Sequence, residues 1–230
     1  MFISQQINEV RQNIREALSK RSQSEQEISS VKLVAVTKNH GVEAMREAID
    51  FGITSIGENR IQEALKKRSL LNRQVEWHLI GHLQTNKVRQ AITTFDLIHS
   101  VDSQKLATEI SRLAGIHGKV QDILLQVNIG SEESKFGVAP GELYKFAAFC
   151  GNLEFVRICG IMALAPYFED TEQARPLFQE LYRLFCETKQ QCLPNGDIQW
   201  LSMGMTNDYT IAIEEGSNLV RIGTGIFGSR

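Results

Sequence analysis

Eight short apolar segments, most of them separated by segments of helical character, constrain this chain more than any other feature of its sequence. They lie at residues 31–36, 53–57, 75–81, 95–101, 122–129, 156–164, 198–204 and 218–223. Alternation of strands and helices is typical of a parallel sheet with crossover helices. Eight such units predict a closed (β/α)8 TIM barrel over residues 31–230. A doubly wound open sheet is the alternative.

The segment before the barrel carries a helical pattern. Its apolar residues recur at spacings of three and four, which predicts an amphipathic helix over residues 1–20. We expect this helix to cover the barrel floor. Residues 31–230 allow about 25 residues per unit, the compact end for this fold. The chain is therefore expected to be a single domain, 1–230. The apolar residues of the helix are Ile3, Ile7, Val10, Ile14 and Leu18.

Composition excludes several classes of function. The 230 residues carry a net charge of −2, so no basic field favours nucleic acid. The N-terminus is too polar for a signal peptide, and no window approaches the ~20 apolar residues of a membrane span. The four cysteines match no zinc spacing. We expect a monomeric cytoplasmic protein without membrane or metal, and interpret His78, His82 and His99 as packing or supporting groups.

A lysine stands where the first predicted strand ends, in LVAVTKNHG (33–41). Functional groups of a barrel gather at the carboxyl ends of its strands. An amine there can form a Schiff base with an aldehyde or ketone when partly desolvated. The alternative is a surface lysine whose stem packs on apolar neighbours. Lys38 is therefore a candidate for covalent attachment of a carbonyl compound.

Small residues follow the last two predicted strands. LSMGMT supplies Ser202, Gly204 and Thr206, and RIGTGIFG supplies Gly223, Thr224 and Gly225. Barrels often bind phosphate at these two strand ends, where exposed backbone N–H groups hold the anion. Tight helix–strand packing would also explain the small residues. Because strand 8 adjoins strand 1 in a closed barrel, a phosphorylated carbonyl compound near Lys38 is predicted.

Arg221 lies inside the eighth predicted strand, where its side chain would point into the barrel mouth. A salt bridge to an internal carboxylate such as Glu58 is the structural alternative. If the ligand is pyridoxal 5′-phosphate (PLP), an arginine at the ring nitrogen can only donate a hydrogen bond to it. The ring would then withdraw electrons less strongly than one that faces an aspartate.

Motifs covering residues 33–230 closely resemble those of the pyridoxal phosphate homeostasis proteins. They are LVAVTK, IGENRIQEA, WHLIGHLQTNK, HSVDS, LLQVNIGSEESKFG, GIMALAP, LSMGMTND and VRIGTGIFGSR. The resemblance implies a barrel like the N-terminal domain of alanine racemase, with PLP on Lys38 as an internal aldimine. It implies that Arg221 faces the ring nitrogen and that Asn59 lies beside the ring. The residues that it places around the phosphate are Ser202, Met203 (through its backbone), Gly223 and Thr224.

One position departs from the family pattern. Family members often carry a second lysine two positions after the first, and this chain has His40 there. A role of that lysine in PLP transfer therefore has no counterpart at this position. Lys135, in SKFG, matches a later lysine of the family, and its role is left open.

The resemblance implies a PLP carrier in vitamin B6 homeostasis, with PLP-dependent apo-enzymes as candidate partners. A PLP racemase needs a base on each face of the ring. The chain ends at Arg230, seven residues after Gly223, so we expect the domain that supplies the second base to be absent. PLP binding without robust turnover is predicted. The alternatives are a small PLP-dependent amino-acid racemase or lyase and a cofactor-free class I aldolase, which would be colourless.

Overall fold

The computed structural model describes residues 2–21, 30–130 and 136–228, so Lys135 lies outside the described residues. The described strands close into one parallel barrel in the order β1 to β8. The predicted (β/α)8 barrel is confirmed, and the open sheet is wrong. The strands are β1 (Lys32–Val36), β2 (Ser55–Glu58), β3 (Glu76–Leu79), β4 (Leu97–Val101), β5 (Gln121–Val127), β6 (Val156–Ala163), β7 (Gly196–Met205) and β8 (Leu219–Ile222).

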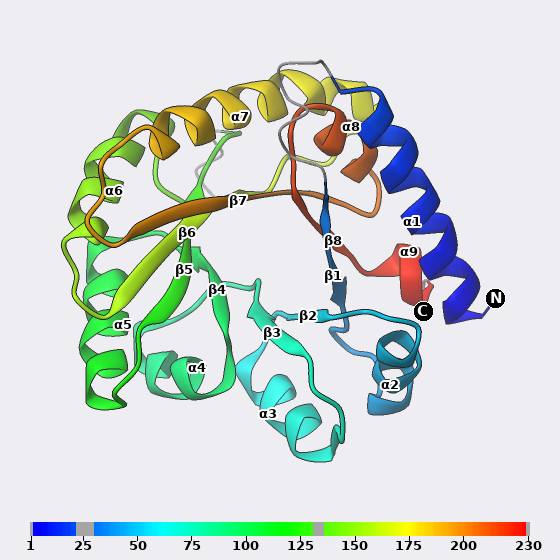
Figure 1. Cartoon of the computed structure of the whole chain (residues 1–230), viewed down its shortest axis with the longest axis horizontal. Helices are drawn as coiled ribbons and strands as arrows, with labels where there is room; N and C mark the ends of the chain where they lie inside the picture. Colours follow the sequence, from blue (N-terminus) through cyan, green and yellow to red (C-terminus); the bar gives the residue numbers. More distant parts are fainter. Residues whose placement is uncertain (1, 22–29, 131–135, 229–230) are drawn as a thin grey trace.

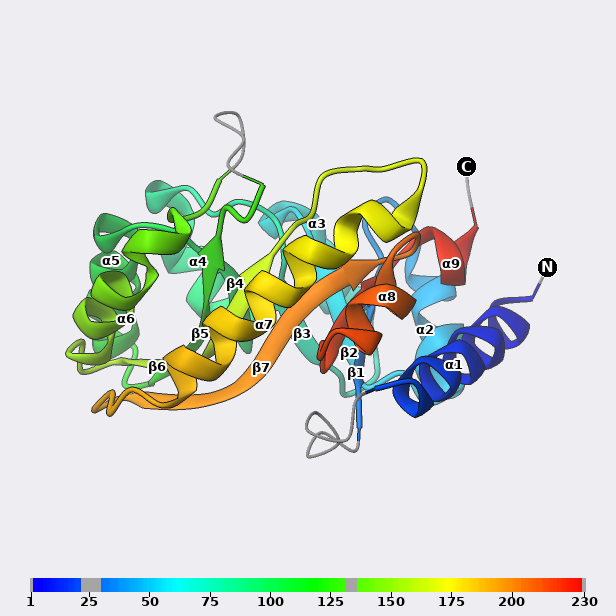
Figure 2. The ribbon, with the colours of Figure 1, turned by 90° about the horizontal axis from the view of Figure 1, so that it is seen from above.

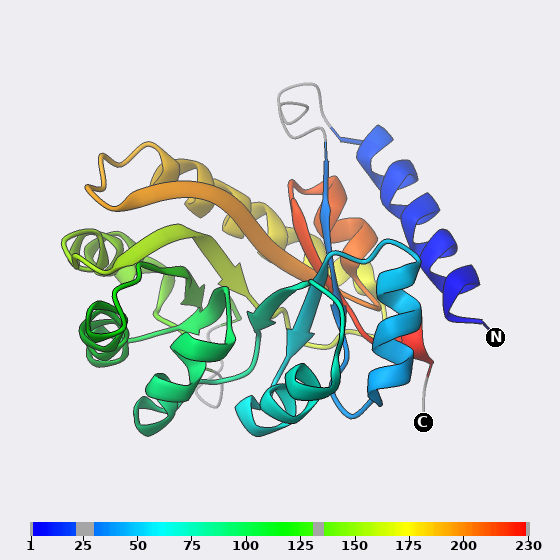
Figure 3. The same cartoon turned by 60° about the horizontal axis from the view of Figure 1, so that its bottom comes forward.

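Helices surround the barrel (Figure 1). The large apolar core lies mainly between them and the outer faces of the strands. Figure 2 shows α7 running along the outside of β7, which it contacts, and Figure 3 shows α2 and α3 outside the first strands. The crossover helices are α2 (Val42–Asp50), α3 (Ile61–Leu70), α4 (Val88–Thr94), α5 (Gln104–Ile116), α6 (Leu143–Gly151), α7 (Arg175–Lys189) and α8 (Tyr209–Glu214), and the chain closes with α9 (Thr224–Phe227).

The N-terminal helix α1 (Ile3–Ser19) belongs to this outer layer. It packs against α2, α8 and α9, and Figure 1 shows it along the outer side of α8 and α9. Ile7, Val10 and Ile14 are buried there, as their spacing predicts. The expectation that this helix covers the barrel floor is wrong. The helix after β8 has only four residues, and α1 fills the place that it leaves in the ring.

Local sequence explains where key elements begin and bend. The Ser103 hydroxyl caps α5 by accepting the Leu106 N–H, and a proline stands in the first turn of α7. β6 has a register shift against β7 between Ile158 and Gly160. Gly160 is required there, because its φ is +151° and a Cβ would lie 1.8 Å from the Trp200 carbonyl oxygen.

The barrel interior is partly polar. A small apolar cluster that includes Val34, Leu124 and Leu219 fills part of it. His78, His99 and other polar side chains occupy the rest and are fully buried. Over the described ranges, no helix is long and apolar enough to cross a membrane, and no group of three or more metal-ligating side chains occurs.

Candidate functional site

A cavity of about 530 Å³ opens at the carboxyl ends of the strands. Segments after β1, β2, β6, β7 and β8 line it. Its volume is that of a site for a small molecule or cofactor. Of the predicted site residues, the structure brings five together around this cavity: Lys38, Asn59, Arg221, Gly223 and Thr224.

Lys38 stands two residues after β1 and lines the cavity. Within the described part of the chain, its amine has no hydrogen-bond or ion-pair partner. Strands β1 and β8 pair in parallel with Val34 opposite Arg221, so Lys38 lies four residues further toward the mouth than the level of Arg221. An unpaired amine therefore faces the cavity close to the end of β8.

The turn that carries Lys38 is held from below by four side chains that we call the Lys67 cluster: Thr37, Glu58, Glu63 and Lys67. The buried Lys67 amine donates to Glu58 at 2.7 Å, to Glu63 at 2.6 Å and to the Thr37 carbonyl at 2.6 Å. The Thr37 hydroxyl donates to Glu58 as well. Two carboxylates thus neutralise the cation, and the cluster fixes the backbone before Lys38 without touching its amine.

The backbone after Lys38 is fixed too. Asn39 has a φ of +65°, a left-handed conformation that asparagine tolerates better than most residues. Its N–H donates to Glu63, which joins the turn to the Lys67 cluster. The ring of His40, at the family's second-lysine position, packs on Phe227 of α9 with centroids 4.9 Å apart. His40 thus links the turn to the end of the chain after β8.

Asn59 follows β2 and lines the cavity. Gly81, after β3, lets the two loops approach, because a Cβ there would lie 2.4 Å from the Asn59 carbonyl oxygen. The close approach explains the glycine in the HLIGH segment. It fixes Asn59 at the rim of the cavity.

Arg221 is buried at the base of the cavity. Its Nη2 donates to the Ala163 carbonyl at 2.9 Å, and its Nη1 donates to the Ser202 hydroxyl. The salt bridge to Glu58 that was the alternative is not formed, because Glu58 pairs with Lys67. Burial lowers the pKa of Arg221 to about 10, partly opposed by the charge of Asp208. The guanidinium is therefore still a cation at neutral pH.

The turns after β7 and β8 meet at one hydroxyl. The N–H groups of Gly223 and Gly225 lie 3.4 and 3.3 Å from Thr206 Oγ1. Thr206 and Thr224 both line the cavity. Hydroxyl and amide donors grouped in this way suit an anion such as a phosphate. Asp208 caps the turn by accepting the Met205 N–H at 2.6 Å, and burial raises the pKa of its carboxyl.

Two predicted phosphate residues, Ser202 and Met203, do not line the cavity. Both are fully buried lower in β7. The Met203 carbonyl accepts the Ser217 hydroxyl at 2.8 Å. Ser202 and Met203 lie three and two residues before the end of β7 at Met205, below the level of the rim. The strand ends one residue after the predicted 198–204, and its rim residues are Met205 to Asp208.

Sequence reasoning also omitted the wall after β6, which is formed by residues 164–168. Its first three residues end the GIMALAP motif, but their apolar side chains carry no chemical signal of a site. The turn after β7 did carry a signal. Gly204 has a φ of +92°, and a Cβ there would meet Ala212 at 2.7 Å, so the glycine within SMGMT marks where the strand bends toward the cavity.

The residues present fit the chemistry of PLP. The cofactor needs an amine for its aldehyde, donors for its phosphate and an apolar wall for its ring. Lys38, the Thr206–Gly223–Gly225 turns, and Val36 with Ile80 supply these groups around one cavity. Arg221 adds a buried cationic donor at the base of the same cavity.

Comparison with known proteins agrees with this fold. The profile of the family described as "Alanine racemase, N-terminal domain" matches residues 6–230. An alanine racemase of Clostridium difficile is 15% identical with a TM-score of 0.72, covering 95% of this chain and 60% of that chain. At that identity, the similarity concerns the fold alone.

More similar proteins match the whole chain. A pyridoxal phosphate homeostasis protein of Aquifex aeolicus is 40% identical over 100% of this chain and 99% of its own length. PipY of Synechococcus elongatus, solved without PLP, is 36% identical with a TM-score of 0.86, covering 98% of this chain and 100% of that chain. PipY with PLP bound has a TM-score of 0.82 at 35% identity and the same coverage. Full-length similarity at this identity shows that the chain belongs to the pyridoxal phosphate homeostasis protein family.

Proposed function

We propose that this protein binds PLP through a Schiff base to Lys38 and serves in intracellular PLP homeostasis, without robust catalytic turnover. The observation that carries the proposal is that the Lys38 amine, which has no partner among the described residues, and the buried Arg221 cation line the same cavity. The similarity to PipY, which has been solved with PLP bound, supports the choice of ligand.

The chain's own residues divide the binding task. Lys38 supplies the amine, and the Lys67 cluster below it holds the turn in place. Thr206, Gly223 and Thr224 would hold the phosphate, and Asn59 would lie beside the ring. Ser202 would act on the ligand indirectly, because its hydroxyl is engaged by Arg221 below the cavity. Met203 would not touch the ligand; as a buried residue of β7 it would help to position the turn that follows the strand.

Arg221 is the reason to expect little turnover. PLP withdraws electrons from a substrate carbon when bound, and does so most strongly with a protonated ring nitrogen. A guanidinium has no acceptor, so Arg221 can only donate to that nitrogen and disfavours its protonation. Retention of the ligand does not require that protonation. The arrangement therefore favours storage or delivery of PLP over chemistry on an amino acid.

The experiment has two parts. PLP titration followed by visible absorbance should give one Schiff base per chain, and borohydride should fix it to Lys38. Alanine, serine and glutamate incubated with the loaded protein should then show negligible racemisation by chiral chromatography. A colourless protein would overturn PLP binding. Sustained turnover at about 1 s⁻¹, the low end for ordinary enzymes, would favour a racemase instead.

A further inference from the structure

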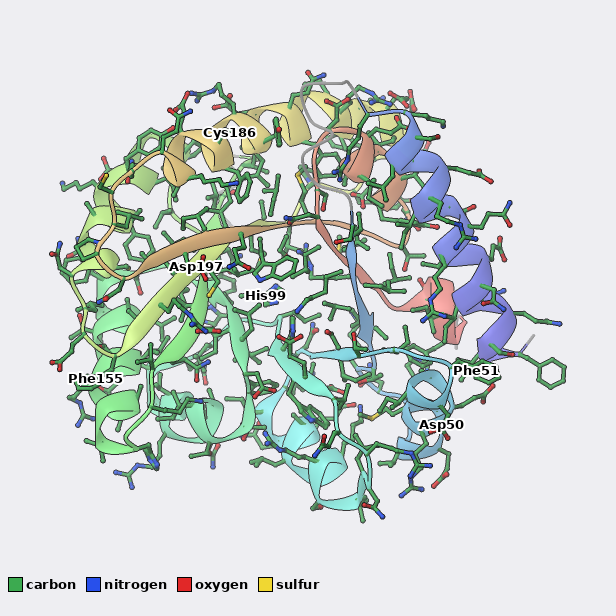
Figure 4. The ribbon with its side chains drawn as sticks, in the orientation of Figure 1. Asp50, Phe51, His99, Phe155, Cys186 and Asp197 are labelled. Atoms are coloured by element: carbon green, nitrogen blue, oxygen red, sulfur yellow. The ribbon has the colours of Figure 1, made fainter. Side chains whose placement is uncertain are left out.

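A chain of polar contacts runs through the barrel interior from its floor to Arg221. The Arg221 guanidinium donates to Ser202 Oγ. Ser202 Oγ lies 3.1 Å from His99 Nδ1, and His99 Nε2 lies 2.9 Å from His78 Nδ1. His78 Nε2 lies 3.2 Å from Glu76 Oε2. We call these five residues the interior chain. Figure 4 shows His99 near the middle of the ribbon, among the strands of the barrel.

The chemistry of its members gives this chain one direction. Arginine only donates, so Ser202 accepts from Arg221. At the other end His78 Nε2 faces the Glu76 carboxylate, which only accepts, so the alternation of donors and acceptors directs the Ser202 proton to His99 Nδ1. Burial lowers the pKa of His99 well below its usual 6.5, and the nearby cations Arg221 and Lys32 lower it further. His99 is therefore neutral, and with Nδ1 accepting, its proton must lie on Nε2.

The same argument continues to the floor. His99 Nε2–H donates to His78 Nδ1, so the proton of His78 lies on its Nε2 as well. Burial lowers the pKa of His78 too, although Glu76 opposes the shift. The Nε2 of His78 faces Glu76, but the contact is not aligned as a formed hydrogen bond. Glu76 is held in turn by Lys32 at 2.7 Å and by the Ser55 hydroxyl at 2.9 Å.

The outcome at the upper end is a cation that is oriented but not neutralised. Within the described residues, no carboxylate forms an ion pair with Arg221; its partners are a hydroxyl and a carbonyl. A carboxylate in place of Ser202 would hold the guanidinium equally well. It would also cancel the charge that disfavours a proton on the ring nitrogen. A neutral acceptor whose own proton is directed away avoids this.

We infer that His78 and His99 are positioning residues for Arg221, each fixed as the Nε2–H tautomer, and that through Ser202 they hold the guanidinium as a charged donor toward the ring nitrogen of PLP. This inference rests on the proposed function for its ligand. The donor-to-acceptor direction of the hydrogen bonds in the interior chain does not depend on any ligand. The side chains that touch the ligand remain Lys38 and Arg221, and the two histidines act through Ser202.

The first measurement needs no ligand. Long-range ¹H–¹⁵N correlation spectra of the histidine-labelled apo protein should show His78 and His99 as neutral Nε2–H tautomers. An Nδ1–H tautomer or a charged ring at either position overturns the inference. If the tautomers are as expected and the protein does not bind PLP, the proposed function fails while the assigned direction stands.

The second measurement tests positioning. His99→Gln can accept from Ser202 and donate to His78, whereas His99→Phe can do neither. Because His99→Phe no longer holds Ser202 in place, the charge-assisted hydrogen bond from Arg221 to the ligand should weaken. We expect a PLP dissociation constant roughly tenfold higher for His99→Phe, and one near the wild-type value for His99→Gln. The ring nitrogen of ¹⁵N-labelled PLP should stay unprotonated at neutral pH in wild type and His99→Gln, and become partly protonated in His99→Phe.

The exposed His117→Gln serves as control and should match wild type in both readouts. A folded His99→Phe that equals His99→Gln in ring-nitrogen shift and affinity overturns the inference. If His99→Phe does not fold, Ser202→Ala takes its place, because it removes the link to Arg221 and leaves both imidazoles. If the ring-nitrogen shift is unchanged in Ser202→Ala, the inference is likewise overturned.

Discussion

Two buried cations lie near the mouth of the barrel, and they are held in opposite ways. Lys67, beneath the end of β1, contacts two carboxylates, Glu58 and Glu63, and is neutralised by them. Arg221, in β8, contacts a hydroxyl and a carbonyl and keeps its charge. Both cations are almost fully buried, so burial by itself does not explain the difference.

The difference matches what each cation supports. Lys67 fixes a backbone turn, and a neutralised cation there leaves the nearby Lys38 amine without a competing carboxylate partner. Arg221 faces the cavity itself, where its charge can act on a ligand. Of these two cations, the one that holds a backbone turn is neutralised by carboxylates, and the one that faces the candidate site keeps its charge.

The largest expected effect comes from removing the Lys38 amine that lines the cavity. Lys38→Ala should abolish the visible Schiff-base band completely, because no other lysine lines the cavity among the described residues. Absorbance and mass spectrometry after borohydride reduction measure this. Lys66→Ala, at an exposed position on α3, is the control. A stoichiometric reduced adduct in Lys38→Ala would assign the attachment to another lysine.

Removing the Lys67 amine should mainly lower the free energy of unfolding. Lys67→Met leaves Glu58 buried without its cation, and loss of one partner of a buried pair typically costs about 3–5 kcal/mol. Urea denaturation of the apo protein measures the free energy of unfolding. Lys66→Met, one residue away but exposed, should change it little. If Lys67→Met is as stable as wild type, the Lys67 cluster does not hold the turn.

The phosphate turn should matter for affinity rather than for attachment. Thr224→Val removes one hydroxyl donor to an anion, a loss of roughly 1.5–3 kcal/mol, or about ten- to a hundredfold in dissociation constant. Fluorescence titration with PLP measures it, with the exposed Thr93→Val on α4 as control. Ser202→Ala should weaken binding less, since Ser202 does not line the cavity. Equal losses would place Ser202 in direct contact with the phosphate.

The smallest effect concerns pH. His99 is neutral in the folded state because its pKa is lowered, whereas the unfolded chain takes up a proton near pH 6.5. The unfolded state therefore binds more protons below pH 6.5, and the contribution of His99 to stability, full above that pH, is lost as the pH falls. At about pH 5.5 the loss is roughly 1.4 kcal/mol.

The measurement is a difference between two proteins. Wild type should lose more unfolding free energy than His99→Gln between about pH 7 and about pH 5.5. Burial raises the carboxyl pKa values of Glu58, Asp102 and Asp208, which gives shifts of the opposite sign. These are present in both proteins and cancel in the difference. Parallel pH profiles would contradict a buried neutral His99.

Local sequence pattern is enough to predict the barrel and most of its rim. Apolar runs alternating with helical segments indicate strands and helices whatever lies around them. Because parallel strands present their carboxyl ends at one face, the order of the strands alone assigns Lys38, Asn59, Gly223 and Thr224 to one mouth. The apolar face of α1 is also predictable, because its apolar residues recur at spacings of three and four.

The side-chain contacts below the rim are decided only by the tertiary structure of the closed barrel. Whether Ser202 meets a ligand or Arg221 depends on where β7 ends, and β7 continues to Met205. Whether Glu58 pairs with Arg221 or Lys67 depends on side-chain reach across strands far apart in sequence. The interior chain joins β3, β4, β7 and β8. Such contacts follow from barrel closure and register, which act over long sequence separations and leave no mark in the local pattern.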